Sequence, residues 1–405
     1  CCGWSSEYDE YRDCYSGTFD LILGGSFTGT LPPEIGLLTN MRMLEVVQQI
    51  EGFSLGGSIP SEIGLLTTTE NLIIYGQPEY HKGIKIGGTL PTETGLMTSL
   101  TSLRLHGSLL EGSLPTELGD LVRLTGLTIT GNKRLNGPLP TQIGRLTSLG
   151  GLLLENNSLS GTIPTEIGRL TKLNYWTIHD NDMKGPIPSE MGKAEQLSMF
   201  VAHSNHFTGA LPVELGDMNE LRRLDVHQNL IEGTIPVDWK GFEALAGMDV
   251  SDNKLEGSIP PFFVSFRRLG KLNLSSNNLV GTIPSEFGMM TQLEELLLHD
   301  NHLSGTVPDG LADAPYLYVL GIYKNDIEGT IPDGLCRHSD LYTDDRMSLI
   351  FVDCDKVTCP PVDCWCIDGN KVEDELSSVH LDHWDWYWHD DSLDEPDFAM
   401  CSDEI

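Results

Sequence analysis

The chain has 405 residues, and 59 acidic side chains against 25 basic ones give it a formal net charge of −34. Such a charge argues against binding of nucleic acid or of an anionic membrane surface, and it favours solubility, a saline environment or cationic partners. No run approaches the roughly 18 apolar residues that a membrane-spanning helix needs. The length would allow two or three globular domains. Such domains do not account for the 43 glycines and 22 prolines of the chain.

Cysteines occur only near the two ends of the chain. Because the chain begins at Cys1 rather than at a methionine, we interpret it as a mature or trimmed product, with an N-terminal cysteine cap over residues 1–26. Terminal clusters around a cysteine-free middle are typical of disulfide-stapled caps in a secreted or extracellular protein of the cell surface or cell wall. The count is odd, so one thiol is free, pairs with another chain or has lost its partner. The cysteines expected in disulfides are Cys1, Cys2, Cys14, Cys336, Cys354, Cys359, Cys364, Cys366 and Cys401.

Residues 27–335 form an internal repeat that explains the glycines and prolines. The pattern G-x-[ILV]-P occurs thirteen times, and from the fifth copy onward the spacing is always 24 residues. In one unit, Leu173, Trp176 and Ile178 are expected to point inward with the period of a half-buried strand. A single unit cannot bury its apolar side alone, so about thirteen neighbouring units must stack into a solenoid.

Two polar columns accompany the repeat. In nine units from Asn132 to Asn325 an asparagine such as Asn181 ends the strand, and an inward asparagine can satisfy turn groups that would otherwise be buried unpaired. A glutamate such as Glu166 recurs in P-[ST]-E-x-G, where the first turn of a short convex helix favours a carboxylate. We interpret the glutamates as a capping and solubilising stripe, with a cation-binding ridge as the alternative.

The generalised unit L-x-x-L-x-x-L-x-L-x-x-N-x-L-x-G-x-I-P resembles the plant-type leucine-rich repeat of receptor-kinase ectodomains, receptor-like proteins and polygalacturonase-inhibiting proteins. The resemblance covers residues from about 25 to about 352. It implies an α/β repeat fold, a right-handed leucine-rich repeat solenoid with a parallel concave β-sheet and disulfide-stapled caps. Residues 336–366 are expected to form the C-terminal cysteine-rich cap, with one final strand from Leu349 to Val352. This cysteine-dense end is similar to secreted leucine-rich repeat proteins of diatoms and related marine algae.

The repeat is interrupted near its start by insertions at residues 48–57 and 75–88. Insertions in a solenoid often bind partners, although neutral drift in loops explains them equally well. The residues best able to contact a ligand there are Tyr75, Tyr80, His81 and Lys82.

Residues 367–405 form an acidic aromatic tail with thirteen acidic residues against one lysine, around the stretch HLDHWDWYWHDD. A disordered acidic tail is poor in aromatic residues, so we expect this segment to pack on the cap or the solenoid. The alternatives are a cation-binding tail that uses His380, His383 and His389, or a docking strip for a basic partner.

Aligning the units places five of the twelve histidines in one outward column of the concave face. His179, His203 and His227 would follow one another on strands about 4.8 Å apart, which spreads the outer Cα atoms of the row to about 9.6 Å. Tetrahedral zinc needs convergent ligands, so we assign no dedicated metal site and no cofactor beyond weak Ca²⁺ or Zn²⁺ binding. A pH switch is an alternative. Stacked imidazoles repel each other when protonated, whereas the acidic surroundings favour protonation, so the sequence leaves the direction of the pKa shift open. We predict a ligand-binding surface formed by Tyr175, Thr177, His179, His203, Arg222, Arg223, Asp225, His227, Asp249, Lys271, His299 and Tyr323.

Two N-x-[ST] sequons predict N-glycosylation of Asn156 and Asn273. A glycan on Asn273 would project from the concave strand and block part of the ligand-binding surface.

The sequence predicts a non-enzymatic extracellular recognition or adhesion protein, receptor-like, that binds a protein, peptide or cell-wall glycan on its concave face. We find no nucleophile elbow, no phosphate loop and no carboxylate pair distinguishable from the repeat columns, so no catalytic residues are assigned. Two alternatives stay open, a secreted inhibitor of a cell-wall-degrading enzyme and an acidic matrix or adhesion protein cross-linked by divalent cations. We expect no nucleic-acid partner and no direct membrane insertion within this chain.

Overall fold

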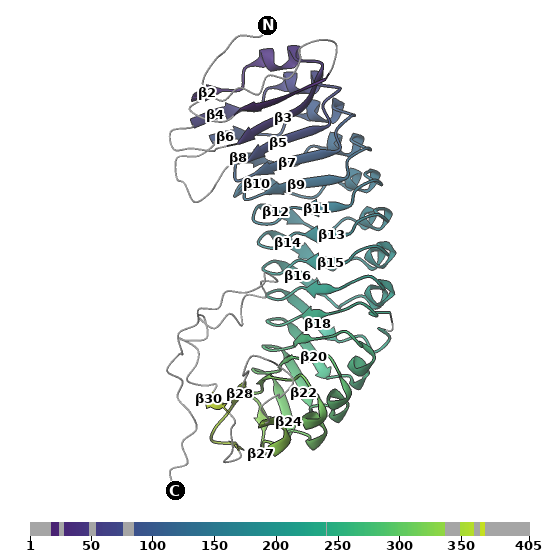
Figure 1. Ribbon diagram of the computed structural model, residues 1–405, viewed down its shortest axis with the longest axis vertical. Helices are drawn as coiled ribbons and strands as arrows, with labels where there is room; N and C mark the ends of the chain where they lie inside the picture. Colours follow the sequence, from purple (N-terminus) through teal and green to yellow (C-terminus); the bar gives the residue numbers. More distant parts are fainter. Residues whose placement is uncertain are drawn as a thin grey trace. The chain divides into compact units, whose positions relative to one another are not determined.

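The computed structural model describes residues 18–23, 28–47, 54–75, 85–239, 241–336, 349–359 and 365–368. The chain divides into two compact units, each of which is a stack of repeating coils (Figure 1). The first unit contains Cys1–Thr208 and Pro212–Glu220, and the second contains Gly209–Leu211 and Leu221–Ile405. Among the described residues, no helix is both long enough and apolar enough to cross a membrane.

Each unit is built on a parallel sheet, called the main sheet below, to which every coil contributes one strand. In the first unit its strands are β1 (Phe19–Leu23), β3 (Met41–Val47), β5 (Asn71–Tyr75), β7 (Ser102–His106), β9 (Gly126–Thr130), β11 (Gly151–Leu153), β13 (Tyr175–Thr177) and β15 (Met199–Val201). In the second unit they are β17 (Arg223–Asp225), β19 (Gly247–Asp249), β21 (Lys271–Asn273), β23 (Glu295–Leu297), β25 (Val319–Gly321), β28 (Leu349–Val352) and β30 (Trp365–Asp368). The predicted strand at Leu349–Val352 is confirmed, but β30 follows it.

A second parallel sheet, which the sequence did not predict, lies where the G-x-[ILV]-P segments begin. Its strands in the first unit are β2 (Thr28–Thr30), β4 (Ser54–Ser58), β6 (Lys85–Gly88), β8 (Leu109–Gly112), β10 (Arg134–Gly137), β12 (Ser158–Gly161), β14 (Asp182–Gly185) and β16 (His206–Gly209). Those in the second unit are β18 (Leu230–Thr234), β20 (Lys254–Ser258), β22 (Asn278–Gly281), β24 (His302–Gly305) and β26 (Asp326–Ile327). A separate pair joins β27 (Gly329–Thr330) to β29 (Val357–Thr358).

The leucine-rich repeat solenoid is as expected, but its helical parts are short 3₁₀ helices, and the described residues contain no α-helix and, between β18 and β19, no helix at all. A coil that supplies two strands leaves few residues for a helix, and 3₁₀ helices are used as short pieces. The expected capping is also absent, because a proline precedes each helix and the Thr116 hydroxyl donates instead to the adjacent Glu117 carboxylate (3.1 Å). The helices are η1 (Pro33–Leu37), η2 (Ser61–Leu65), η3 (Thr92–Leu96), η4 (Thr116–Asp120), η5 (Thr141–Arg145), η6 (Thr165–Arg169), η7 (Ser189–Lys193), η8 (Val213–Asp217), η9 (Pro261–Ser265), η10 (Ser285–Met289), η11 (Asp309–Asp313) and η12 (Asp333–Cys336).

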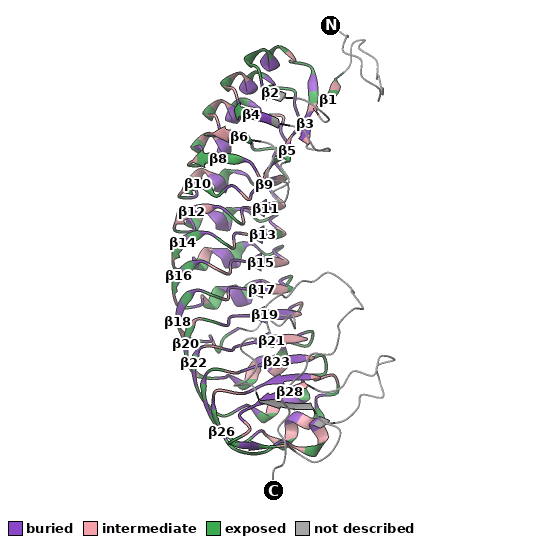
Figure 2. Ribbon diagram, turned by 90° about the vertical axis from the view of Figure 1, so that its left-hand side faces the viewer, coloured by how far each residue is buried: buried purple, intermediate pink, exposed green. Residues whose placement is uncertain are grey.

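The core of each unit lies between the main sheet and the rest of the coil (Figure 2). The predicted inward residues Leu173, Trp176 and Ile178 are fully buried. The asparagine ladder is confirmed. The Asn205 amide donates to the carbonyls of Ile178 in the preceding coil (3.0 Å) and Ala202 in its own (3.2 Å), while its Oδ1 accepts from the backbone N–H of Met183 (2.9 Å).

The glycine of P-[ST]-[EQ]-x-G lets successive 3₁₀ helices approach closely. A Cβ added at Gly144 would lie 2.5 Å from the carbonyl oxygen of Glu166 and 2.6 Å from its Cβ. A Cβ added at Gly95 would meet Glu117 in the same way, 2.5 Å from its carbonyl oxygen. Since real Cβ atoms do not approach backbone so closely, the next coil would have to shift to accept any side chain at this position.

We therefore expect Gly144→Ala to lower the free energy of unfolding by about 2 kcal/mol or more, because the coils are held apart. The matched variant Gly126→Ala is expected to leave stability unchanged, since no atom lies within 4 Å of a Cβ placed there. Denaturant unfolding followed by circular dichroism measures both. Equal midpoints for the two variants would contradict the close approach.

Candidate functional site

The candidate site is the outer face of the main sheet, which we define as the side that looks away from the core. Side chains alternate along each strand, so Tyr175 and Thr177 lie on this face while Trp176 is buried between them. Tyr175 is 53% exposed, and His179, which follows on the same face, is partly exposed. Parallel register then aligns each of these positions with its equivalent on the next strand.

In the first unit, aromatic rings stack across neighbouring coils of this face. Tyr75 and His106 are register partners on β5 and β7, with ring centroids 4.7 Å apart and planes 19° apart. His179 and His203 stack more closely, at 4.3 Å and 17°. Part of the predicted histidine column is thus a set of stacked pairs, and side chains as well as backbone fix the spacing of its rings.

Local hydrogen bonds hold these rings. Nδ1 of His179 lies 2.9 Å from Asp180 Oδ2, and Nδ1 of His203 lies 3.1 Å from the Ser204 hydroxyl. Nδ1 of His106 lies 2.6 Å from the Thr130 hydroxyl. Burial lowers the pKa of His106 below its ordinary value, and the charge of Glu155 only partly opposes this effect.

Two neighbouring register positions on the outer face of the first unit carry no side chain and form a short glycine strip, with Leu153 Cδ1 3.6 Å from where a Cβ of Gly151 would lie. Gly126 and Gly151 are register partners on β9 and β11, and the next strands contribute Ser102 on one side and Tyr175 on the other. A Cβ at Gly126 would meet nothing within 4 Å. The strip is therefore a place where a ligand can contact the sheet backbone beside an exposed aromatic ring.

Arg104 is a residue of this face that the sequence analysis did not assign. It is exposed on β7, aligned with Thr128 on β9, and forms no ion pair with any described residue. Extending the alignment of units to the row that holds Thr177 would have found it. Glu155, which accepts a hydrogen bond from the Thr177 hydroxyl, supplies an acidic group to the same face.

In the second unit, the predicted contact residues Asp225 and Asp249 are buried, with 1% and 3% of their surface exposed. Asp225 accepts hydrogen bonds from Arg223 Nη2 (2.9 Å) and from Nδ1 of His227 (2.7 Å). Its carboxylate also faces the backbone N–H of His227, two residues on. The side chain folds back onto its own strand, so the two aspartates predicted to contact a ligand are buried and hydrogen-bonded within the chain.

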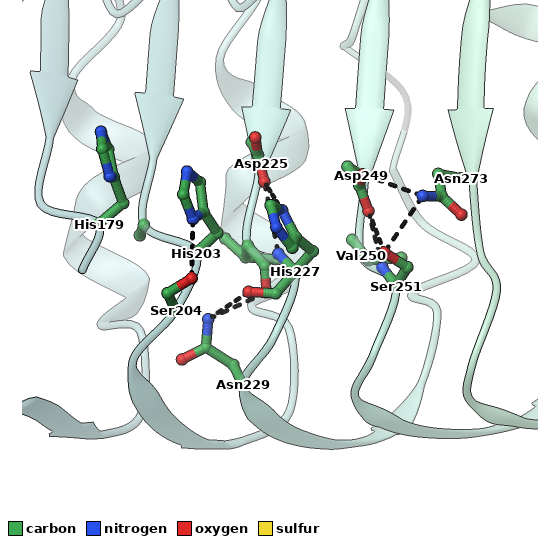
Figure 3. A network of polar contacts seen from close by, with 12 residues as sticks. His179, His203, Ser204, Asp225, His227, Asn229, Asp249, Val250, Ser251 and Asn273 are labelled. Carbon is green, nitrogen blue, oxygen red and sulfur yellow. Dashed lines mark hydrogen bonds and ion pairs between the residues drawn. The ribbon is translucent and has the colours of Figure 1, made fainter. Parts of the chain in front are cut away.

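The same folded-back arrangement recurs on the next two strands, and Figure 3 shows the one formed by Asp249 and Ser251. Asp249 Oδ1 accepts from the backbone N–H (2.9 Å) and the hydroxyl (2.6 Å) of Ser251. Asn273 Oδ1 accepts from the same two groups of Ser275, at 3.1 and 2.7 Å. The Asn273 amide donates to Asp249 Oδ2 (3.0 Å) and to the Ser251 hydroxyl (3.2 Å).

The carboxylate of Asp249 lies beside that of Asp225 on the neighbouring strand. Burial raises the pKa of Asp249 to about 6, and the charge of Asp225 adds to the increase, while His227 and the Ser251 hydrogen bonds oppose it. Burial lowers the pKa of His227, but the hydrogen bond and charge of Asp225, with the charge of Asp249, outweigh it and leave this pKa raised. Both shifts favour proton uptake by the folded chain.

Toward the C-terminal end of the second unit, residues of the outer face pack on one another. Leu297, Val319 and Phe351 form a buried cluster against Tyr323 and other partly buried side chains. His299 stacks on Tyr323 at 4.5 Å and 6°. Its Nδ1 is buried without a hydrogen-bond partner among the described residues, and burial lowers the pKa of His299 to about 4. His299 therefore stays neutral at ordinary pH.

The remaining predicted residues are distributed as follows. Arg222 is exposed and Arg223 partly exposed, whereas Lys271 binds Glu295 (2.6 Å), whose carboxylate also accepts from the Tyr318 hydroxyl (2.9 Å). The insertion residues Tyr80, His81 and Lys82 and the tail after Asp368 lie outside the described residues.

Of the cysteines, Cys354 and Cys359 are disulfide-bonded. Cys336 and Cys366 are described only by their backbone. Outside the described residues lie Cys1, Cys2, Cys14, Cys364 and Cys401.

The two sequons differ in accessibility. Asn156 is exposed in a turn with φ 61°, whereas Asn273 is 6% exposed and fully engaged by its neighbours. Asn273 therefore does not project from the sheet as expected. After expression in a secretory eukaryotic host, we expect glycopeptide mass spectrometry to find a glycan on Asn156 and an unmodified Asn273. Occupancy of Asn273 in folded protein would contradict the buried network.

The raised pKa of Asp249 predicts a pH dependence of stability. Between about pH 4 and about pH 6 the folded chain binds a proton that the unfolded chain has released, so stability falls as the pH rises through this range. Asp249→Asn removes the buried charge, and Asn273 shows that an amide fits this position. We expect the variant to have a higher unfolding midpoint than the wild type above about pH 6 and a smaller loss of stability on raising the pH.

The control for this measurement is Glu256→Gln, which removes an exposed charge on β20. It should leave the pH dependence of the midpoint unaltered. A pH dependence that is identical in wild type and Asp249→Asn would contradict the assignment.

Comparisons with known proteins agree with this architecture. The family model described as Leucine Rich Repeat matches residues 268–290 and 292–314. No curated protein matches the chain.

Three solved structures are similar over most of the chain. The TDR receptor shares 28% identity over 84% of this chain and 59% of its own, with a TM-score of 0.69. The Arabidopsis receptor kinase HAESA ectodomain, solved with an N-terminally extended IDA peptide hormone ligand, shares 27% identity over 84% and 53%, with a TM-score of 0.66. PEPR1–AtPEP1 shares 26% over 78% and 46%, with a TM-score of 0.63. The chain thus spans about half the length of these ectodomains. Two of its repeats match the Leucine Rich Repeat model, and the chain as a whole is similar in fold to plant receptors of this kind.

Proposed function

We propose that the chain is a non-enzymatic extracellular recognition module that binds a peptide, or an extended segment of a protein, on the outer face of the first unit. The HAESA ectodomain, which is similar in fold and repeat sequence, is described with a peptide hormone ligand. The disulfide bonds of Cys354 and Cys359 support an oxidising, extracellular location.

The glycine strip is the observation that carries this proposal. An extended peptide needs backbone-to-backbone approach, which Gly126 and Gly151 permit because they place no side chain on the face. Tyr175 beside the strip supplies a rigid ring, the kind of residue that dominates binding energy at interfaces. Arg104 supplies a guanidinium without an ion-pair partner among the described residues, available to a carboxylate or carbonyl of the ligand.

The outer face of the second unit is less suited to this role because its charged groups already satisfy one another. Asp225 holds Arg223, and Glu295 holds Lys271. Freeing these groups for a ligand would leave buried charges unpaired, which is strongly destabilising.

The charge of the chain narrows the class of peptide. A net charge of −34 repels acidic ligands at long range and accelerates the association of basic ones. The proposed ligand is therefore a peptide of net positive charge that carries an isolated carboxylate for Arg104.

Panning a phage-displayed random peptide library on the purified chain tests the proposal. For the selected peptides, we expect Tyr175→Ala and Arg104→Ala each to raise the Kd at least tenfold, about 1.4 kcal/mol. Gly126→Ala should also weaken binding, because its methyl group occupies the strip without disturbing the fold.

The control is Lys184→Ala, which truncates an exposed side chain on β14 of the second sheet. It should leave the Kd unchanged. Selected peptides that bind Tyr175→Ala, Arg104→Ala and Gly126→Ala as tightly as the wild type would refute binding at the strip.

A further inference from the structure

His179 and His203 form the closest stacked pair of rings among those described on the outer faces. They occupy equivalent positions 24 residues apart in successive coils, with ring centroids 4.3 Å apart. Figure 3 shows the two rings side by side. In each ring, the nitrogen farther from Ser204 points in the same direction. Two imidazoles are thus presented together on one face of the first unit.

The turn after each histidine orients its ring. Asp180 and Ser204 have φ of 53° and 51°, a left-handed conformation that puts each side chain beside the preceding imidazole. A carboxylate only accepts hydrogen bonds, so Nδ1 of neutral His179 donates to Asp180, and Nε2 carries the lone pair. Histidines that bind metals in proteins have this arrangement, with the second ring nitrogen held by a carboxylate or another acceptor.

From this geometry we propose that His179 and His203 bind a divalent transition-metal ion, such as Zn²⁺ or Cu²⁺, with Asp180 as a positioning residue. One donor atom from each of the three residues lies within 4.8 Å of the others. Bonds of about 2.0–2.1 Å in a tetrahedral site require the two nitrogens to be about 3.3 Å apart. Because stacked rings direct their nitrogens in parallel, both rings must unstack and tilt toward each other before their lone pairs converge on one ion, and water would complete the coordination.

The chemistry favours this class of ion. Imidazole nitrogen suits zinc, copper and nickel, and Cu²⁺ binds such sites more tightly than Zn²⁺. Three histidines in a flat row would spread their Cα atoms over about 9.6 Å, which is unsuited to a tetrahedral metal site. Two histidines on adjacent strands avoid that spread, and the net charge of −34 attracts cations to the protein.

A second cluster, Asp225, His227 and Asp249, also places its donor atoms within 4.8 Å of one another. Arg223 already binds Asp225, and both aspartates are buried. An ion there would have to displace a paired guanidinium from a closed site, so we assign no metal to this cluster.

Isothermal titration of the full chain with ZnCl₂, and electron paramagnetic resonance with Cu²⁺, test the proposal. We expect saturable binding of one ion, with copper coupled to imidazole nitrogen, and at least tenfold weaker binding in His179→Ala and in His203→Ala. Asp180→Asn should weaken binding about tenfold without changing the thermal unfolding midpoint, as expected for a positioning residue.

Two controls separate this site from others. His206→Ala truncates an exposed histidine on β16 and should leave metal affinity unchanged. The triple variant His380→Ala/His383→Ala/His389→Ala removes the tail histidines and should also retain the site. The proposal is overturned if the wild type shows no saturable binding, if His179→Ala and His203→Ala bind as tightly as wild type, or if affinity is lost with the tail histidines.

Discussion

The inward asparagine after each main-sheet strand from β9 to β25 is the interaction on which the rest of the structure depends. Asn205 bonds the carbonyls of two successive coils and receives a backbone N–H from the segment that leads into the second sheet. Without this side chain the turn would bury unpaired backbone groups. Since nine successive coils, from Asn132 to Asn325, carry this asparagine, the coils are held in one register, and equivalent residues line up across the outer face.

Because the strands are aligned in register, the side chain at each position of the outer face interacts with the equivalent side chain on the next strand. Aromatic rings at equivalent positions stack, as Tyr75 and His106 do. Carboxylates at equivalent positions repel: burial raises the pKa of Asp249 to about 6 with a further contribution from Asp225, and the hydroxyl and amide donors around Asp249 lower the cost of burial. Because of the repeat, a side chain on one strand lies beside its equivalent on the next. Such a pair either stacks, as the aromatic rings do, or needs hydrogen-bond donors around it, as the carboxylates do.

The repeat, the inward residues and the asparagine ladder could be predicted because each follows from a period that the sequence displays directly. The 3₁₀ helices could not, since a proline, a glutamate and a glycine in P-[ST]-E-x-G suit the first turn of either helix type. The burial of Asp249 and Asn273 was missed for another reason. Strand alternation gives the direction of the Cβ atom but not the rotamer that folds the side chain back onto Ser251 or Ser275. For His179, the Cα spacing was a poor guide because Asp180 and the stacked His203 fix the ring.

The residue before each ladder asparagine has a left-handed backbone, which affects both the stability of the fold and the order of the outer face. Eight such residues in the described part of the chain are not glycine, and each left-handed residue with a Cβ costs roughly 1 kcal/mol. Glycine at these turns would relieve that strain and strengthen the fold. At Asp180 and Ser204, however, the strained residue also supplies the group that holds the preceding imidazole. Selection for a more stable solenoid and selection for an ordered outer face therefore act in opposite directions at the same two residues.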